Sequence, residues 1–381
     1  MSFVKGIGER FGSRLRRFAQ PWEIVCFGWV PAVGLGFGLW YALRARGTLG
    51  DFPIFRAASK AVLHGHSPYV AADPGALANF DKFVYPPAAA FLLSPLAILP
   101  LGLAKILMFF LGVVTALLAL RLLGVRDWRC YGVAALSAPV VNSVAIGALT
   151  SFLLLGTALT WRYRDRPVLS GAAASVTAVV KLFLWPLGLW LLVTRRLRAA
   201  AAFFVVALVA IVAGWAAIGF AGFRAYPHLL RVLSDLEAGV SYSPIALLRL
   251  SGSGAAALSA VLVITVVVAV ALAARRADGD RRSFTIAVIG SLVATPVLWL
   301  HYFALLLVPL ALYRPRLSGL WFVPFVLWAT PETHSGGSVW RIGLALAVLA
   351  LVAGRVLGGN ALRRADDRPR RLAPVAVSSR R

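Results

Sequence analysis

The chain has 381 residues, 60% of them hydrophobic, and a formal net charge of +25 at pH 7. This apolar share is far larger than a soluble domain needs to fill its core, so the sequence indicates an integral membrane protein. The charge therefore does not indicate nucleic-acid binding, because Lys and Arg accumulate in the cytoplasmic loops of membrane proteins. Cys26 and Cys130 lie in or beside apolar segments and predict neither a disulfide framework nor a thiolate metal site.

Apolar runs bounded by arginine clusters predict an all-α polytopic bundle of about twelve membrane spans. The basic N-terminus, residues 1–23, precedes a run without a small-residue cleavage site, so this run is expected to be a retained span. One membrane domain is predicted over residues 24–357, followed by a basic tail over residues 358–381. The predicted spans are 24–43, 101–123, 128–144, 146–161, 168–180, 183–194, 199–219, 255–273, 284–298, 300–313, 317–330 and 339–357.

The segments between the predicted spans include two long outer loops, where chemistry is expected. An outer loop over 44–85 contains two expected short helices, near 53–63 and 74–83. Residues 86–99 are too short and proline-rich for a span, and they are interpreted as a re-entrant or interfacial segment. A second outer loop follows over residues 220–250.

The distribution of charge predicts the orientation. If the N-terminus is cytoplasmic and the spans alternate, most of the 39 basic residues fall on the cytoplasmic side, and both termini are cytoplasmic. All five histidines then lie outside, whereas the cytoplasmic loops are short, rich in arginine and suited to lipid headgroups. The outer side is therefore the predicted place of chemistry. The histidines are His64, His66, His228, His301 and His334.

Asp51 is the first candidate for chemistry. It follows the first span almost directly, in Gly50-Asp51-Phe52-Pro53, at the outer membrane face. A carboxylate at such a partly desolvated boundary can accept a proton from a hydroxyl group. The alternative is an N-cap for a helix that starts at Pro53, and the two roles are compatible.

Lys181 and His301 each stand at a break between apolar runs. Lys181 either snorkels to the outer headgroups or pairs with a phosphate as a point charge. His301, beside Trp299 and Tyr302, belongs either to an interfacial aromatic belt or to a site where it contacts a sugar hydroxyl or a phosphate, or assists proton transfer.

Two further patterns are weaker. His64 and His66 have the spacing of a loop chelate, but no third ligand is close, so no metal site is predicted. Asp278-Gly279-Asp280 resembles the two-aspartate metal clamp of nucleotide-sugar transferases, but flanking arginines favour a solvated turn. Glu332 and His334 of the last outer loop are expected either to be solvated or to line an acceptor groove.

Several motifs occur together in the first outer loop and the segment after it, and in this order they resemble glycosyltransferase family 87. That family comprises multispan mannosyltransferases with a C-type transferase fold. The segments around Lys181 and from Pro296 to Tyr302 also resemble the family's patterns. The motifs are Asp51-Phe52-Pro53-Ile54-Phe55-Arg56-Ala57-Ala58, Gly65-His66-Ser67-Pro68-Tyr69, Tyr85-Pro86-Pro87 and Ser94-Pro95-Leu96.

The resemblance implies an enzyme of glycolipid biosynthesis that moves mannose from a polyprenyl phosphate to a lipid-linked or glycan acceptor outside the cell membrane. It assigns the catalytic aspartate to Asp51 and a histidine near the donor to His301. Binding of the donor phosphate or sugar is assigned to Lys181, Arg56, Lys60, Tyr69 and Tyr85. No cofactor, metal or nucleic-acid partner is expected; the expected partners are the donor, the acceptor and membrane lipids.

One departure from the family pattern is visible. Where such sequences often carry Gly-Gln-x-Asn at the start of a helix, this chain has Gly147-Ala148-Leu149-Thr150. The sugar could therefore be arabinose, which related transferases take from the same lipid carrier. A secondary transporter is the competing class, because a dozen spans with both ends inside also suit that architecture. A catalytically lapsed scaffold is a third alternative.

Overall fold

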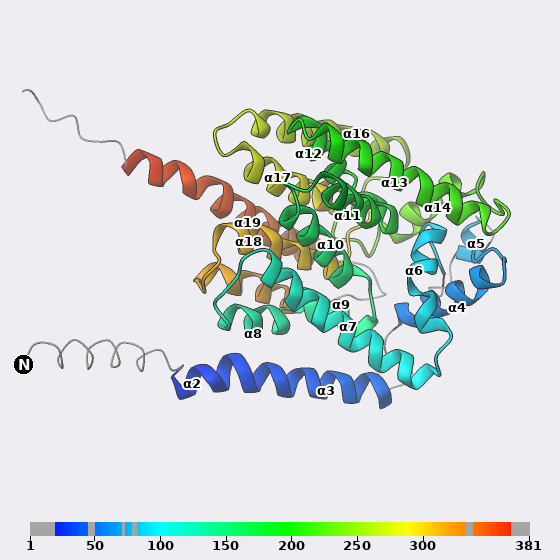
Figure 1. The fold of residues 1–381 in the computed structure, drawn as a ribbon, viewed down its shortest axis with the longest axis horizontal. Helices are drawn as coiled ribbons and strands as arrows, with labels where there is room; N and C mark the ends of the chain where they lie inside the picture. The colour runs from blue at the N-terminus through cyan, green and yellow to red at the C-terminus, as the bar shows by residue number, and fades with distance from the viewer. Residues whose placement is uncertain (1–19, 45–49, 71–72, 78–81, 332–337, 367–381) are drawn as a thin grey trace, which may run out of the picture.

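The computed structural model describes residues 20–44, 50–70, 73–77, 82–331 and 338–366, and these form helices and turns without a β-strand (Figure 1). The predicted all-α class is thus confirmed. Most of the predicted basic N-terminus and tail, together with Glu332 and His334, lies outside the described residues. The last helix reaches Asp366, beyond the predicted start of the tail.

The helices follow the chain order of the predicted apolar runs. The first half contains α2 (Pro21–Ile24), η1 (Val25–Trp29), α3 (Val30–Arg44), α4 (Asp51–Leu63), α5 (Pro74–Leu77), α6 (Pro87–Ala97), α7 (Leu101–Leu122), α8 (Arg129–Leu136), α9 (Ala138–Ile146), α10 (Thr150–Arg162) and α11 (Pro167–Val180). The second half contains η2 (Leu182–Leu184), α12 (Pro186–Val193), α13 (Leu197–Ala216), α14 (Tyr226–Glu237), α15 (Pro244–Leu247), α16 (Gly252–Ala274), α17 (Gly279–Ala294), η3 (Leu300–Leu306), α18 (Leu307–Tyr313), η4 (Gly319–Ala329) and α19 (Val339–Asp366).

The described residues offer fewer candidate membrane spans than the twelve that the sequence predicts. Five described helices are long and apolar enough to cross a bilayer, or six if α8 and α9, bent by 60° at their junction, form one span. The predicted runs near 146–161, 168–180 and 183–194 are helices, but each is too short to cross about 30 Å of hydrocarbon. They contribute to the protein interior instead: Leu153 and Leu154 of α10 are fully buried.

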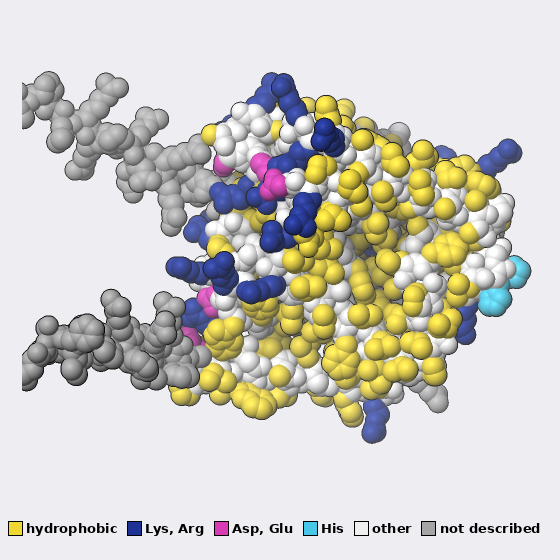
Figure 2. Space-filling view, viewed as in Figure 1, with side chains coloured by type: hydrophobic (Ala, Val, Ile, Leu, Met, Phe, Trp, Pro, Cys, Tyr) yellow, Lys and Arg dark blue, Asp and Glu magenta, His cyan; other side chains and the backbone are white. Residues whose placement is uncertain are grey.

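The long helices differ in how much of their surface is covered. Only 11% of the apolar window of α16 is buried, compared with 44% for α7. Apolar side chains cover much of the visible surface between the two ends of the molecule (Figure 2). Such a surface belongs in lipid rather than in water, which supports a membrane protein.

The molecule has two different ends. At one end α2 begins and α19 ends, and Lys and Arg side chains gather there (Figures 1 and 2). We call this the basic end. At the other end lie α4 and α5 of the first predicted outer loop, α6 of the predicted re-entrant or interfacial segment, and α14 of the second predicted outer loop (Figure 1). We call this the loop end.

Helices α4 and α6 pack together at the loop end. The predicted helix near 53–63 is confirmed as α4, which buries Phe52 and Phe55. The proline-rich segment 86–99 forms the short helix α6, and the Ser59 hydroxyl of α4 donates to the Ala90 carbonyl at 2.7 Å. This contact fixes α6 against the first outer loop.

The other predicted loop helix, near 74–83, lies partly outside the described residues. Helix α5 covers Pro74–Leu77, and residues 82–86 are not helical. Tyr85 precedes Pro86, and a residue before proline is disfavoured in the helical region of backbone space. Consequently Tyr85 lies in a non-helical segment that leads into α6.

The second outer loop is more structured than the sequence predicts. It contains α14 and α15, and α14 buries only Leu229. The loop also binds the segment after α17: the Tyr242 amide donates to the Leu298 carbonyl at 2.7 Å, and Ser241 Oγ accepts from the Leu298 amide at 2.9 Å. These bonds hold the chain just before η3.

Candidate active site

Lys181 lies at a break between two helices. Helix α11 ends at Val180, and Lys181 adopts an extended conformation (φ −145°, ψ 104°) before the short helix η2. Because the chain leaves the helix here, the Lys181 side chain is placed by a sharp change of direction rather than by helical periodicity.

Aromatic groups hold the Lys181 ammonium. Lys181 Nζ donates to the Tyr85 hydroxyl at 2.9 Å. It also lies 4.0 Å from the centre of the Tyr302 ring and 4.6 Å from that of Tyr85. Cation–π contacts of this kind stabilise a cation that has lost part of its water. The snorkelling alternative for Lys181 is therefore wrong, because the amine packs among aromatic rings.

Asp51 is the first residue of α4, and its side chain is partly buried. The residue before the helix is Gly50, and no side chain caps the helix there. The capping alternative for Asp51 is therefore wrong. Burial raises the pKa of Asp51 from 3.8 to about 6, while the positive charge of Lys181 opposes that rise. Asp51 and Lys181, far apart in the sequence, thus share one electrostatic environment.

Tyr85 connects these two charges. Burial raises the pKa of its hydroxyl well above the usual 10, and the negative charge of Asp51 raises it further. The hydroxyl therefore stays protonated in the presence of Lys181. The Tyr69 hydroxyl donates to the Tyr85 carbonyl at 2.7 Å, and the Phe55 ring lies 4.9 Å from the Tyr85 ring. The predicted donor-site residues Tyr69 and Tyr85 are thus brought together, with Tyr69 acting on the backbone.

A wall of aromatic side chains joins the two outer loops beside Tyr85. Tyr69 stacks on Trp215 of α13, with ring centres 5.3 Å apart. The Tyr226 hydroxyl of α14 donates to the Val84 carbonyl at 3.0 Å. These contacts fix the segment that carries Tyr85, since its backbone accepts hydrogen bonds from the hydroxyls of Tyr69 and Tyr226.

His301 is buried at the start of η3, with 3% of its surface exposed. Its ring packs edge-on against Tyr302 at 4.6 Å, and Tyr302 in turn stacks on Phe183 at 4.9 Å. An aromatic-belt residue would face lipid headgroups, so the belt alternative for His301 is wrong. His301 therefore adjoins the site, because the ring of the next residue, Tyr302, contacts Lys181 Nζ.

Arg56 and Lys60 are not brought to the Lys181 ammonium by any contact of the described residues. Arg56 Nη2 donates to the Leu99 carbonyl at 2.9 Å, and Lys60 is exposed. Helix geometry explains this, because five residues after Asp51 correspond to about 140° around the helix and nine residues to about 180°. Arg56 therefore ties α4 to the end of α6.

The weaker metal patterns do not assemble a ligand set. His64 and His66 are exposed, and Asp280 pairs with Arg196 at 2.9 Å and with Arg164 at 3.4 Å. Among the described residues no group of three His, Cys, Asp or Glu side chains is placed to hold a metal ion. Asp280 is thus an ion-pair partner, rather than half of a metal clamp or a simple solvated carboxylate.

Several site residues escape sequence reasoning. The sequence indicates Tyr302 only as a neighbour of His301. The other residues that position the site are aromatic or hydroxyl side chains that form no motif. Their one sequence signal is that each adjoins a helix end or a loop. They are Phe183, Trp215, Tyr226, Ser241 and Tyr242.

The site therefore offers a carboxylate that is more basic than usual, a desolvated ammonium and an aromatic wall, all at the loop end. Residues 83–301 match glycosyltransferase family 87, and this interval contains Tyr85, Lys181 and His301 but not Asp51. No curated protein and no solved structure matches the chain. Because the family match covers more than half of the sequence, the chain belongs to glycosyltransferase family 87.

Proposed function

We propose that this glycosyltransferase is an inverting mannosyltransferase that takes its sugar from a polyprenyl phosphate. Its acceptor is a lipid-linked molecule or a glycan, and the product is an α-mannoside. The single observation that carries the proposal is the shared environment of Asp51 and Lys181 beside Tyr85. A carboxylate that can accept a proton lies near an ammonium that can bind a phosphate.

In the proposed reaction, Asp51 takes the proton of the acceptor hydroxyl while the oxygen attacks the anomeric carbon from the face opposite the phosphate. The bond between the anomeric carbon and the phosphate oxygen breaks, and the electron pair leaves with the polyprenyl phosphate. Lys181 stabilises the charge on that phosphate as a point charge. One displacement inverts the anomeric centre, so a β-linked donor gives an α-linked product.

The electrostatic coupling makes Asp51 responsive to the donor. In the free protein Lys181 lowers the Asp51 pKa, which burial raises to about 6. A donor phosphate bound to Lys181 would offset this positive charge, and the Asp51 pKa would rise further. A general base works best when its pKa lies near the working pH. Donor binding would thus bring Asp51 closer to its optimum.

The surrounding groups have supporting roles in this proposal. Tyr85 holds the Lys181 ammonium through its hydroxyl. His301, next to Tyr302, is proposed to contact the sugar, and Tyr69, stacked on the buried Trp215, is proposed to keep the Tyr85 segment in place.

The proposed location is the cell membrane, with the loop end outside and both termini in the cytoplasm. The separation of the basic end from the loop end supports this orientation (Figure 2). Lys60→Cys at the loop end and Arg276→Cys at the basic end, both at exposed positions, can be labelled in intact cells with a membrane-impermeant maleimide. The proposal requires Lys60→Cys alone to react, in a Cys26→Ser and Cys130→Ser background that keeps activity. Labelling of Arg276→Cys alone would reverse the orientation.

The activity is tested with purified protein in lipid extract and radiolabelled polyprenyl-phosphate mannose. Formation of a labelled, alkali-stable glycoside is the expected result. Use of polyprenyl-phosphate arabinose instead would keep the reaction class and change the sugar. If neither donor is consumed while proteoliposomes accumulate a solute, the protein is a transporter and the proposal fails.

A further inference from the structure

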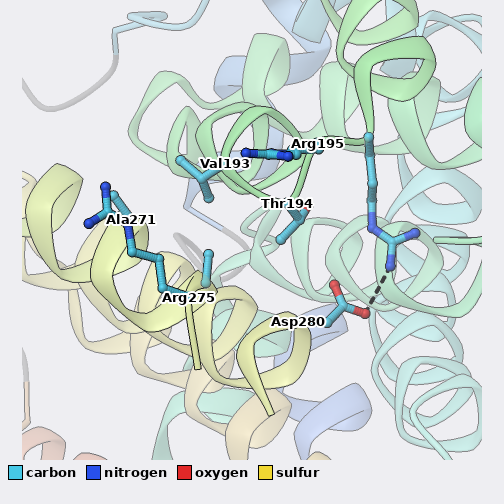
Figure 3. A pocket seen from close by; sticks show the side chains of 8 residues that line it. Val193, Thr194, Arg195, Ala271, Arg275 and Asp280 are labelled. Carbon is cyan, nitrogen blue, oxygen red and sulfur yellow. Dashed lines mark hydrogen bonds and ion pairs between the residues drawn. The ribbon is translucent and has the colours of Figure 1, made fainter. Parts of the chain in front are cut away.

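A pocket of about 600 Å³ opens at the basic end, far from the candidate active site. It lies where α12 gives way to α13 and where α16 ends before α17 (Figure 3). Val193, Ala271 and Ala274 form its apolar lining. Arginine side chains complete the wall, so the pocket combines an apolar floor with positive charge.

Two of these arginines are in excess over the acidic groups. Asp280 in the wall pairs with Arg196 at 2.9 Å, which Figure 3 marks with a dashed line. Asp165 lies 3.6 Å from the same guanidinium. In the described part of the chain Arg195 and Arg275 form no ion pair, although both line the pocket. The pocket therefore has two guanidinium groups available for an anion.

The backbone presents these arginines from separate elements. Arg195 has a left-handed conformation (φ 57°), with its amide bonded to the Leu192 carbonyl and the next amide bonded to Leu191. This is the Schellman arrangement that ends α12, and it reverses the chain toward α13. Arg275 follows the last turn of α16. Figure 3 shows Arg195 and Arg275 on different walls of one opening.

The size and surroundings of the pocket select the class of anion. A volume near 600 Å³ is typical of sites for whole small molecules and is far larger than an inorganic phosphate needs. Leu192, Leu197 and Leu272 beside the pocket are 40%, 65% and 54% exposed. Because α13 begins and α16 ends here, and both are candidate spans, the pocket lies at a membrane boundary. We propose that it binds the phosphate of an anionic phospholipid, whose acyl chains lie along these leucines.

This site is separate from the candidate active site. Trp215, which stacks on Tyr69, is near the end of the 20-residue helix α13, whereas the pocket is at its beginning. A helix of that length spans about 30 Å. The lipid proposed here therefore lies at the opposite membrane boundary from the glycosyl donor, and its binding does not depend on the proposed reaction.

The test compares the wild-type chain with the double variant Arg195→Gln/Arg275→Gln. Each protein is incubated in bilayers of phosphatidylcholine and phosphatidylglycerol, extracted into detergent, and analysed by native mass spectrometry for retained lipid. The matched control is Arg198→Gln/Arg276→Gln, which removes two exposed arginines from the same turns outside the pocket wall. The wild type and the control should retain phosphatidylglycerol preferentially, whereas its affinity in the double variant should fall about thirty-fold.

Additional arms keep the test decisive. Arg275→Gln alone changes a residue with ordinary backbone angles (φ −79°), so it should remain folded and still weaken retention. Equal retention by the wild type and both pocket variants would overturn the site. Inorganic phosphate should neither displace phosphatidylglycerol nor raise the melting temperature. If phosphate alone protects the protein as well as the lipid does, the ligand is a free anion and the lipid proposal is wrong.

Discussion

Charged side chains are held differently at the two ends of the molecule. At the loop end Lys181 packs between Tyr85 and Tyr302, and its charge acts on the partly buried Asp51. At the basic end Asp280 lies between two arginines but keeps 36% of its side chain exposed. In the first region burial raises the pKa of Asp51 to about 6, whereas in the second region water screens the charge of Asp280. The contrast is what the proposed reaction requires of the loop end.

The largest expected effect is on Asp51. Asp51→Asn keeps the shape of the side chain but removes the base, so transfer should fall by about 10²- to 10⁴-fold. The measurement is product formation at saturating donor, with membrane insertion checked in parallel. Asp235→Asn, an exposed aspartate on α14 at the same end, is the matched control and should keep full activity. Substantial turnover by Asp51→Asn would mean that Asp51 is only a structural residue.

Removal of the Lys181 charge should have the next largest effect. Lys181→Gln leaves the departing phosphate without its point charge, so kcat should fall by about 10²-fold. Lys60→Gln removes an exposed lysine from the same end and should change kcat little. Equal losses from both variants would show that long-range charge, rather than contact, explains the effect.

Tyr85→Phe should have a smaller effect than either charge deletion. The variant keeps the ring against the Lys181 ammonium but loses the hydroxyl that accepts from Nζ at 2.9 Å. A single such hydrogen bond contributes about 1 kcal/mol, so kcat/KM should fall roughly five-fold. Tyr69→Phe loses instead the hydrogen bond from the Tyr69 hydroxyl to the Tyr85 carbonyl, and it should leave the pH dependence of kcat/KM unchanged. An unchanged kcat/KM in Tyr85→Phe would contradict a role for the hydroxyl.

Asp280→Asn should have the smallest effect. Its ion pairs with Arg164 and Arg196 are partly exposed, so the loss of stability should be no more than about 1 kcal/mol. Transfer activity should not change. Thermal unfolding in detergent measures the first quantity and the labelled-sugar assay the second. A large loss of transfer activity in Asp280→Asn would contradict the proposal that only the loop end takes part in the reaction.

The sequence predicts the helical class and the first loop helix, because periodic apolar runs and an acidic helix start are local signals. It expects more spans than the described helices offer as candidates, since a short, largely buried helix such as α12 is as apolar as the exposed helix α16. It identifies Asp51 and Lys181 as single residues beside breaks in the apolar pattern. It does not reveal Tyr226 or Tyr242, whose roles depend on hydrogen bonds to distant backbone carbonyls.

Arg56 shows that residues close in the sequence need not share a site. As a cation close to Asp51 in the sequence it is a candidate for binding the donor phosphate, but in the structure its guanidinium donates to the Leu99 carbonyl. Proximity in sequence predicts a shared face only at spacings of three or four residues. The juxtaposition of Asp51 and Lys181, by contrast, arises because α6 packs against both α4 and α11 and Tyr85, just before α6, contacts Lys181, which no local pattern encodes.

The most direct test of the coupled Asp51–Lys181 site is the pH dependence of kcat/KM, in the wild type and in Lys181→Gln. Asp51 must be deprotonated to act as a base, so activity should be lost as the pH falls through about 6 and should reach a plateau above it. Because Lys181 lowers the Asp51 pKa, the residual activity of Lys181→Gln should show the same limb displaced to higher pH. A wild-type profile without a limb near pH 6, or a limb that Lys181→Gln leaves in place, would contradict the account.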